Sequence, residues 1–149
     1  MATSELMNLR RPVAREMRYE GVHCDVVIEE LTDRVILLRI CGTDVGEFGE
    51  APMKELNHWM AGVPVDFFID ARDVRGASIE VSGEWAGWLN AHKEGLKSVT
   101  MLTGSRFILI TAEFVRRFAG LEGVMRICTE PAVFDRVLAE ACGRSPQFR

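Results

Sequence analysis

The run 65–69, VDFFI, constrains the fold more than any other part of the sequence, because four of its five residues are apolar. An amphipathic helix needs a longer segment with apolar residues every three or four positions, and a half-exposed strand needs polar residues at alternate positions. This run has neither pattern, so it indicates a short strand that is covered on both faces of a sheet. We therefore expect 65–69 to be a central strand.

Segments typical of strands and helices alternate along the rest of the chain. Two stretches rich in Val, Ile and Leu, 22–31 and 34–41, flank the turn residues Thr32 and Asp33 and predict a hairpin. Apolar residues at three- and four-residue steps predict helices after the later turns. The predicted strands are 22–31, 34–41, 65–69, 97–103 and 124–128, and the predicted helices start at Pro52, Ser82, Thr111 and Glu130-Pro131.

Local signals set the ends of two of these helices. The helix that starts at Pro52 is expected to run to about Ala61, and the helix that Ser82 caps is expected to stop at Gly95. The second helix contains Gly83 and Gly87, four positions apart. Glycine lowers helix propensity, so this pair suggests a packing reason.

The third helix follows the residues Gly104-Ser105 and the apolar run 107–110. Thr111 is a hydroxyl residue that can cap it. Helical spacing predicts which side chains face the core and which face water. The predicted core residues are Phe114, Val115 and Phe118, and the predicted solvent-facing residues are Arg116 and Arg117.

Alternation after the opening hairpin requires parallel neighbouring strands joined by helical crossovers. The predicted class is α/β, with a mixed five-stranded sheet, an opening hairpin and helices packed on the sheet with their apolar stripes turned inward. We expect one domain over 21–143, preceded by an N-terminal arm over 1–20 and followed by a C-terminal tail over 144–149.

The composition limits the classes of partner. The 149 residues are 48% apolar and 27% charged, with a net charge of -4, which offers no general attraction for nucleic acid. Apolar runs reach only a few residues, far short of the ~20 that span a bilayer. Residues 1–20 carry four arginines and three glutamates and do not resemble a secretory signal. We therefore expect a cytoplasmic protein without a membrane span.

The residues that bind metals or act as nucleophiles form no known motif. The four cysteines include no C-x-x-C pair, and the three histidines complete no zinc spacing, so neither a metal nor a cofactor is expected. His23, Cys24 and Asp25 are neighbours, but adjacent residues of a strand point to opposite faces and cannot form a catalytic triad. Phosphate-binding glycine loops and the G-x-S-x-G motif are missing. The chain is therefore predicted not to be an enzyme.

The order of elements, together with a strand ending in Asp70, a loop and then Glu80-Val81-Ser82-Gly83 opening a helix, resembles the STAS domain of sulfate transporters and anti-sigma factor antagonists. The order is also similar to the related CRAL-TRIO fold. The family's usual motif is Asp-Ser-Ser-Gly followed by an apolar residue, so Val81 and Glu84 depart from it. The segment 111–140 also resembles small bacterial proteins of this superfamily that have no assigned activity.

The resemblance implies a role for Ser82, because anti-sigma factor antagonists are phosphorylated on the serine before the glycine and then lose their partner. Phosphate at a helix N-terminus meets free amides, so it need not unfold the helix. The alternative is that Ser82 only caps the helix. The carboxyl ends of the strands should form the surface for a partner or ligand. Its candidate residues are Asp70, Arg72, Asp73, Glu80, Gly83, Glu84, Ser105 and Arg106.

Two hypotheses on function follow. The first is a non-enzymatic STAS-like interaction or regulatory module that binds a protein partner of unknown identity, with phosphorylation of Ser82 as a switch. The second is a protein that binds a small apolar or lipid-like ligand near Trp85, Trp88 and Leu89, as the similarity to the CRAL-TRIO fold permits. The alternative is that the tryptophans only fill the core. A homodimer is an option under either hypothesis if Trp59, Met60, Trp85 or Trp88 exceed what one core needs.

Overall fold

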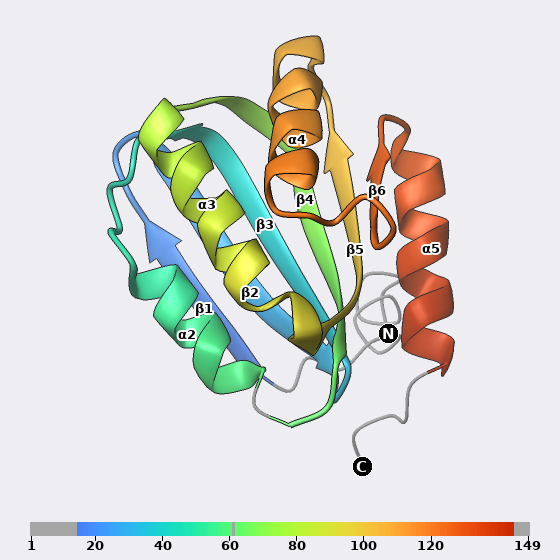
Figure 1. The fold of residues 1–149 in the computed structure, drawn as a ribbon. Helices are drawn as coiled ribbons and strands as arrows, with labels where there is room; N and C mark the ends of the chain where they lie inside the picture. Colours follow the sequence, from blue (N-terminus) through green and yellow to red (C-terminus); the bar gives the residue numbers. More distant parts are fainter. Residues whose placement is uncertain (1–14, 61, 145–149) are drawn as a thin grey trace, which may run out of the picture.

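The computed structural model of the chain describes residues 15–60 and 62–144, whose six strands form one sheet in the order β1-β2-β3-β4-β5-β6 (Figure 1). Sequence neighbours are therefore also neighbours in the sheet. The strands are β1 (Arg15–Glu20), β2 (Cys24–Thr32), β3 (Val35–Asp44), β4 (Val65–Ala77), β5 (Leu96–Thr103) and β6 (Met125–Cys128).

The first three strands pair antiparallel. β2 and β3 confirm the predicted hairpin. The prediction of a five-stranded sheet is wrong by one strand, because β1 lies within the segment predicted to be an arm. Its edge position explains the error: four of its six residues are exposed, so the sequence carries little apolar alternation there. Residues 1–14 of the predicted arm and 145–149 of the predicted tail lie outside the described residues.

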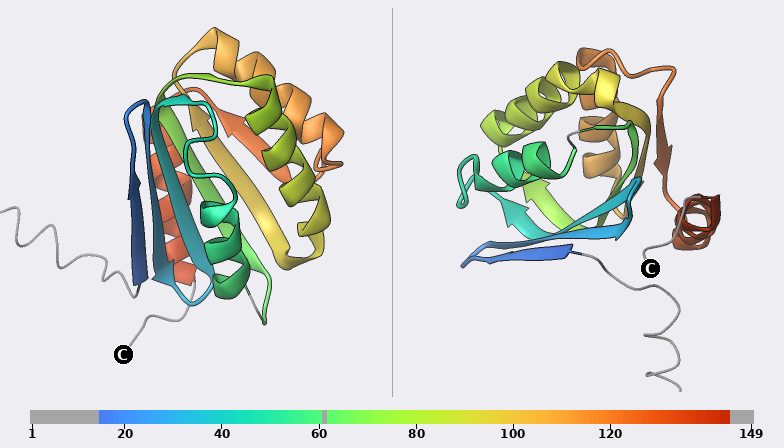
Figure 2. Two further views of the ribbon diagram at one scale, coloured as in Figure 1. Left: turned by 90° about the vertical axis from the view of Figure 1, so that its left-hand side faces the viewer. Right: turned by 90° about the horizontal axis from the view of Figure 1, so that it is seen from below.

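From β3 onward every pair of strands is parallel, as the alternation of elements predicted. Each crossover leads to the next strand of the sheet, and crossovers of one hand then place their helices on the same face. Figure 2 shows α2, α3 and α4 together on one face and α5 alone on the other. The helices are α2 (Ala51–Trp59), α3 (Ile79–Ala91), α4 (Arg106–Phe118) and α5 (Pro131–Arg144), with a short 3-10 turn η1 (Lys93–Gly95) after α3.

The strand β4 contributes side chains to the core on both faces of the sheet. Residues 65–69 are all buried, which confirms the predicted central strand. Phe67 contacts Trp88 of α3 at a ring-centroid distance of 5.8 Å, whereas Phe68 meets Phe134 of α5 edge-on at 5.8 Å. Successive residues of a strand point to opposite faces, so the two phenylalanines belong to separate clusters of the core.

The strand β4 also continues through residues predicted to be a charged loop. It pairs with β3 as far as Ala77, opposite Asp44, with two irregularities in the register. Val74 is buried within this extension, while Asp73 and Arg75 are exposed. Because a partner strand supplies the hydrogen bonds of the extension, the composition of the segment alone gives no sign of it.

The start of α4 differs from the prediction. The helix begins at Arg106, and the hydroxyl of Ser105 accepts a hydrogen bond from the amide of Ile108 at 3.0 Å. Thr111 is therefore not the cap; its hydroxyl donates to the carbonyl of Phe107 within the helix. The apolar run 107–110 belongs to the helix.

Candidate functional site

Ser82 lies inside α3 and does not cap it. The cap is Ser78, whose hydroxyl accepts a hydrogen bond from the amide of Val81 at 3.1 Å. The amide of Ser82 donates to the carbonyl of Ser78 at 3.0 Å, as expected one turn into a helix. The predicted capping role of Ser82 is therefore wrong. Its role as a phosphoacceptor stays a prediction.

An apolar cavity of about 90 Å³ lies between α3, α4 and the sheet. Ser82 is half-buried and lines this cavity together with Trp85. The remaining walls are almost entirely apolar, with Leu38, Ile69 and Val115 among them. The cavity can therefore exclude water but offers few polar groups to orient a ligand.

The second tryptophan of the ligand hypothesis does not line the cavity. The indole Nε1 of Trp88 donates to Asn57 Oδ1 on α2 at 2.9 Å, and its ring stacks on His92 at 4.5 Å. The Trp85 ring meets that of Trp88 edge-on at 5.9 Å. Trp88 is therefore part of the core. Of the three residues predicted to contact a ligand, only Trp85 and Leu89 line the cavity.

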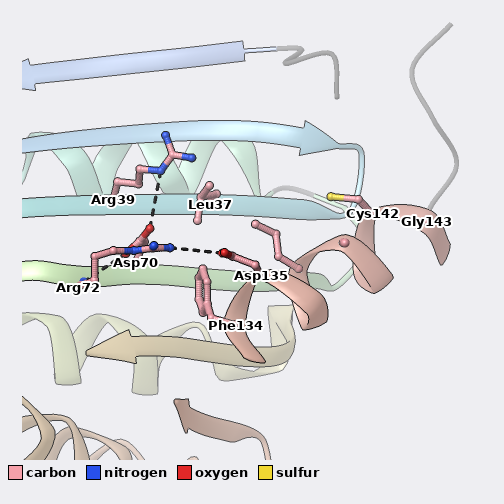
Figure 3. Close-up of a pocket in the computed structure, with 10 residues that line it drawn as sticks. Leu37, Arg39, Asp70, Arg72, Phe134, Asp135, Cys142 and Gly143 are labelled. Carbon is pink, nitrogen blue, oxygen red and sulfur yellow. Dashed lines mark hydrogen bonds and ion pairs between the residues drawn. The ribbon is translucent and has the colours of Figure 1, made fainter. Parts of the chain in front are cut away.

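A larger groove of about 610 Å³ lies on the opposite face of the sheet, between α5 and the strands β3 and β4. Figure 3 shows its floor, where Leu37 and Phe134 lie beside charged residues from the strands. Cys142 and Gly143, at the C-terminal end of α5, close the far end. The groove combines an apolar floor with a charged wall.

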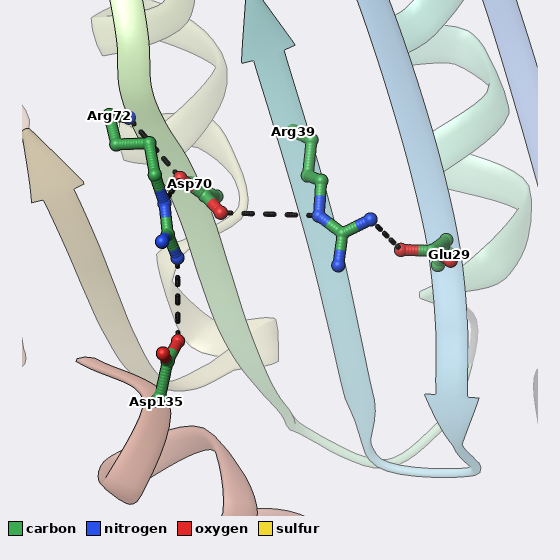
Figure 4. Close-up of polar contacts among 5 residues, drawn as sticks. All are labelled: Glu29, Arg39, Asp70, Arg72 and Asp135. Carbon is green, nitrogen blue, oxygen red and sulfur yellow. Dashed lines mark hydrogen bonds and ion pairs between the residues drawn. The ribbon is translucent and has the colours of Figure 1, made fainter. Parts of the chain in front are cut away.

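The charged wall is a chain of alternating ion pairs, drawn in Figure 4. Asp70 Oδ1 accepts from Arg72 Nε at 3.0 Å, and Asp70 Oδ2 lies 3.9 Å from Arg39 Nε. Arg72 Nη2 reaches Asp135 Oδ1 at 3.4 Å. Arg39 Nη1 lies 3.3 Å from Glu29 Oε1, a buried oxygen without a hydrogen-bond partner among the described residues.

The hydrogen bond that Arg72 donates to Asp70 stabilises the charged guanidinium and raises the pKa of Arg72 above its ordinary value, against the opposing effect of burial. Three carboxylates and two guanidinium groups largely neutralise one another in this network. The groups are already paired, so the groove presents polar contacts rather than a strong net charge. Arg39 and Asp135 were not among the predicted site residues, because no local pattern indicates that β3 and α5 meet here.

The predicted partner surface is split between the two faces of the molecule. Asp70 and Arg72 belong to the groove beside α5. Exposed residues on the other side include Arg106 of α4 and the α3 residues Glu80, Gly83 and Glu84. The remaining members do not join these groups into one site: Asp73 is exposed on β4, and Ser105 is occupied in capping α4.

Among the described residues, the most exposed large apolar side chains include a stripe on α4 that the sequence interpretation missed. Phe114 and Phe118 were predicted to face the core but are 57% and 65% exposed, and their rings stack at 5.4 Å. Phe107 and Ile110 continue the stripe at 60% and 64%. Two apolar stripes share this helix, and the buried one consists of Ile108, Ala112 and Val115.

The exposed stripe could have been suspected from the sequence, since a helix with apolar residues around most of its circumference has more of them than one core can cover. On the neighbouring helix α3, Ile79 is 87% exposed. The two helices contact each other on the same face of the sheet (Figure 1). We call the exposed side of this pair the α3–α4 face; it consists of Ile79, Glu80, Gly83, Glu84, Gly87, Arg106, Phe107, Ile110, Phe114, Arg117 and Phe118.

The described part of the chain holds neither a cluster of metal-ligand side chains nor a helix that could span a membrane. No group of three or more His, Cys, Asp or Glu side chains within residues 15–60 and 62–144 is arranged to hold a metal ion. In the same ranges, every helix is too short or too polar to cross a membrane.

Comparison with known proteins decides the fold. No protein-family model matches the sequence, and no curated protein matches it closely. A crystal structure of a DUF3478-family protein with a SpoIIAA-like fold from Shewanella loihica PV-4 superposes with a TM-score of 0.59 at 17% identity, over 80% of this chain and 98% of that one. The chain has a STAS-like fold.

A second solved structure supports the STAS-like fold. The anti-sigma factor antagonist SpoIIAA in its unphosphorylated form is similar with a TM-score of 0.53 and 18% identity, over 76% of this chain and 96% of that one. The resemblance inferred from the order of elements is thereby confirmed at the level of the fold. At these identities the STAS-like fold carries over, while the residues of a site have to be argued from this chain.

Proposed function

We propose that this chain is a non-enzymatic, cytoplasmic regulatory module of STAS-like fold that docks a protein partner on the α3–α4 face. The observation that carries the proposal is the exposed apolar stripe of α4. Four large apolar side chains lie in one line, and each is more than half exposed. An ordinary surface exposes hydrophobic residues singly, so this contiguous patch is larger than usual. Contiguous apolar patches with a polar rim are typical of protein interfaces.

The rim of the α3–α4 face carries acidic residues on one helix and basic residues on the other, which favours one orientation of a bound partner. Glu80 and Glu84 lie on α3, and Arg106 and Arg117 lie on α4, all of them exposed. Rim charges contribute little affinity but select the register of a partner and speed its association. A partner with matching charges is therefore favoured over one that is merely apolar.

Phosphorylation of Ser82 is proposed as a switch of this docking. Ser82 lies on α3 beneath the face, where it lines the cavity, two positions from the exposed Glu80 and Glu84. A phosphoryl group would add roughly -1.5 to -2 charges to the turn of α3 that already carries these two carboxylates. Because the hydroxyl is half-buried against an apolar cavity, its modification requires the side chain to turn outward, which changes the docking surface as well as its charge.

Affinity capture from the native cell tests the proposal, with the full chain as bait. We expect Phe114→Asp to lower the yield of a partner protein at least tenfold, since it places a charge in the middle of the stripe, and Ser82→Asp to lower it while Ser82→Ala does not. Ala132→Asp is the matched control, because Ala132 is exposed on α5. A partner that is retained equally by Phe114→Asp and by Ala132→Asp would overturn the docking surface.

Binding of a small apolar ligand is a second candidate, favoured by the apolar cavity between α3, α4 and the sheet. At about 90 Å³ the cavity admits only a few heavy atoms unless the two helices move apart. Native mass spectrometry of the protein purified from its own cell tests this candidate. A retained molecule that is lost in Ala112→Phe, which fills the cavity, supports it; a spectrum of the bare chain alone contradicts it.

A further inference from the structure

The helix α3 carries two exposed glycines, Gly83 and Gly87, one turn apart. A methyl group added to either would meet no atom within 4 Å. The packing reason that the glycine pair suggests therefore does not lie inside the molecule. Together they leave a shallow trough along the exposed side of α3, bordered by Glu80 and Glu84.

The helix α4 beside it carries the complementary shape. Phe107, Ile110, Phe114 and Phe118 recur at three- and four-residue steps and form a ridge on its exposed side. Arg106 and Arg117 are exposed near its two ends. The same face therefore combines an acidic trough of small residues with a basic ridge of large ones.

We propose that the α3–α4 face docks a second copy of this chain, with the α4 ridge of each copy in the α3 trough of the other. This inference rests on the proposed docking function and names its partner. A two-fold rotation makes both contacts at once, so the assembly closes as a dimer and leaves neither ridge exposed. In each contact the arginines beside the ridge approach the glutamates beside the trough, so the charges attract.

The area of the face suits such a dimer. From their exposed fractions, the ridge and Ile79 present on the order of 600 Å² of surface, if a fully exposed large apolar side chain presents about 180 Å². A stable interface buries about 800 Å² on each partner. The trough and the charged rim supply the difference, so the apolar core and polar rim have the proportions of an ordinary dimer interface.

Sedimentation velocity of the full chain tests the inference, over about 1 to 300 µM, the range of weak to moderate dimers. We expect the wild type to dimerise and Phe114→Asp to weaken dimerisation at least tenfold. Gly87→Gln should weaken it as well, although it improves the helix propensity of α3, because its side chain fills the trough. A loss of folding cannot explain weaker dimerisation in Gly87→Gln, because this change improves the helix propensity of α3. Ala132→Asp on α5 should dimerise like the wild type.

Charge reversal gives a second, independent measurement. Arg106→Glu with Arg117→Glu should weaken the dimer, and so should Glu80→Lys with Glu84→Lys. All four changes in one chain should restore the dimer, since the two sides then exchange the signs of their charges and still attract each other. Restoration supports the ridge-in-trough contact, and its failure contradicts it.

The outcomes separate this inference from the proposed docking function. A wild type that stays monomeric up to about 300 µM overturns the second copy as the occupant. If Phe114→Asp then still lowers capture of a different protein while Ala132→Asp does not, the docking function stands without it. A dimer that Phe114→Asp and Gly87→Gln leave unchanged uses another surface and also contradicts the inference.

Discussion

The carbonyl oxygen of Ser78 accepts a hydrogen bond from the amide of Ser82 at 3.0 Å, so the two serines lie one turn apart at the start of α3. Ser78 stands before the first helical residue and caps the helix with its side chain. Ser82 lies within the helix and faces the cavity between α3 and α4. The two hydroxyl groups therefore have separate roles, one in the stability of α3 and one beneath the proposed docking face.

Replacing the cap should destabilise the protein more than replacing the serine inside the helix. Ser78→Ala leaves the amide of Val81 without its partner and should lower the free energy of unfolding by about 1 kcal/mol. Ser82→Ala should change it by only a few tenths of a kcal/mol. Urea denaturation of both variants measures the difference. Equal losses would show that Ser82 supports the helix start after all.

The glycines of the chain should respond to alanine in opposite directions. At a concentration low enough to keep the protein monomeric, Gly83→Ala should raise the free energy of unfolding by about 0.5–1 kcal/mol, because the new methyl group meets no atom within 4 Å. Gly42 has a φ of +96°, and a methyl group there would lie 2.3 Å from the carbonyl oxygen of His23. Gly42→Ala should therefore lower stability by at least about 1–3 kcal/mol. Thermal denaturation compares the two, and a destabilising Gly83→Ala would reveal a contact not seen here.

The ion pairs of the groove should contribute unequally to stability. Asp70 is buried and accepts from both the amide and the guanidinium of Arg72, so Asp70→Ala should cost about 1–3 kcal/mol. Asp135 is largely exposed and meets Arg72 at 3.4 Å, so Asp135→Ala should cost less than about 1 kcal/mol. Urea denaturation at low and high salt is the measurement. A large, salt-independent loss in Asp135→Ala would contradict this ranking.

The cysteines should differ in reactivity. Burial raises the pKa of Cys24 to about 12, so its thiol stays protonated at neutral pH, and burial also raises the pKa of Cys128. Cys41 is exposed. In the native protein, iodoacetamide should therefore modify Cys41 first, with Cys24 and Cys128 reacting only after unfolding. Peptide mass spectrometry identifies the order, and early modification of Cys24 would contradict the buried position of β2.

The raised pKa of Cys24 also predicts how stability depends on pH. A thiol whose pKa is higher in the folded than in the unfolded chain contributes fully below its ordinary pKa of 9.0. The contribution is lost as the pH rises from 9.0 toward about 12. Cys24→Ser should therefore flatten the decline of the free energy of unfolding above pH 9.0, measured by urea denaturation.

Much of the fold could be predicted because periodicity is a local property. The apolar run 65–69 and the alternation after it led to a parallel sheet with helical crossovers, and residue 65 to residue 69 are buried as expected. The strand β1 escaped prediction because an edge strand needs little apolar sequence, and the extension of β4 escaped because its hydrogen bonds come from β3.

The candidate site was harder to predict, because it depends on contacts between elements that are distant in sequence. Helical spacing led us to predict Phe114, Val115 and Phe118 as core residues, but which apolar stripe is buried depends on the elements packed against α4. Likewise, Ser78 and Ser82 are both acceptable caps, and the length of β4 selects Ser78. Arg39 and Asp135 approach the groove from elements far apart in sequence, so no local pattern brings them together.

By itself, then, the sequence determined the α/β class, the order of most elements and the burial of the central strand, because side-chain periodicity and turn residues act over a few positions. Only the tertiary structure decided the number of strands, the true helix caps, the outward stripe of α4 and the pairing of Arg72 with Asp135. These depend on which surfaces meet across the sheet, and that is fixed by packing between distant segments rather than by the preferences of any one of them.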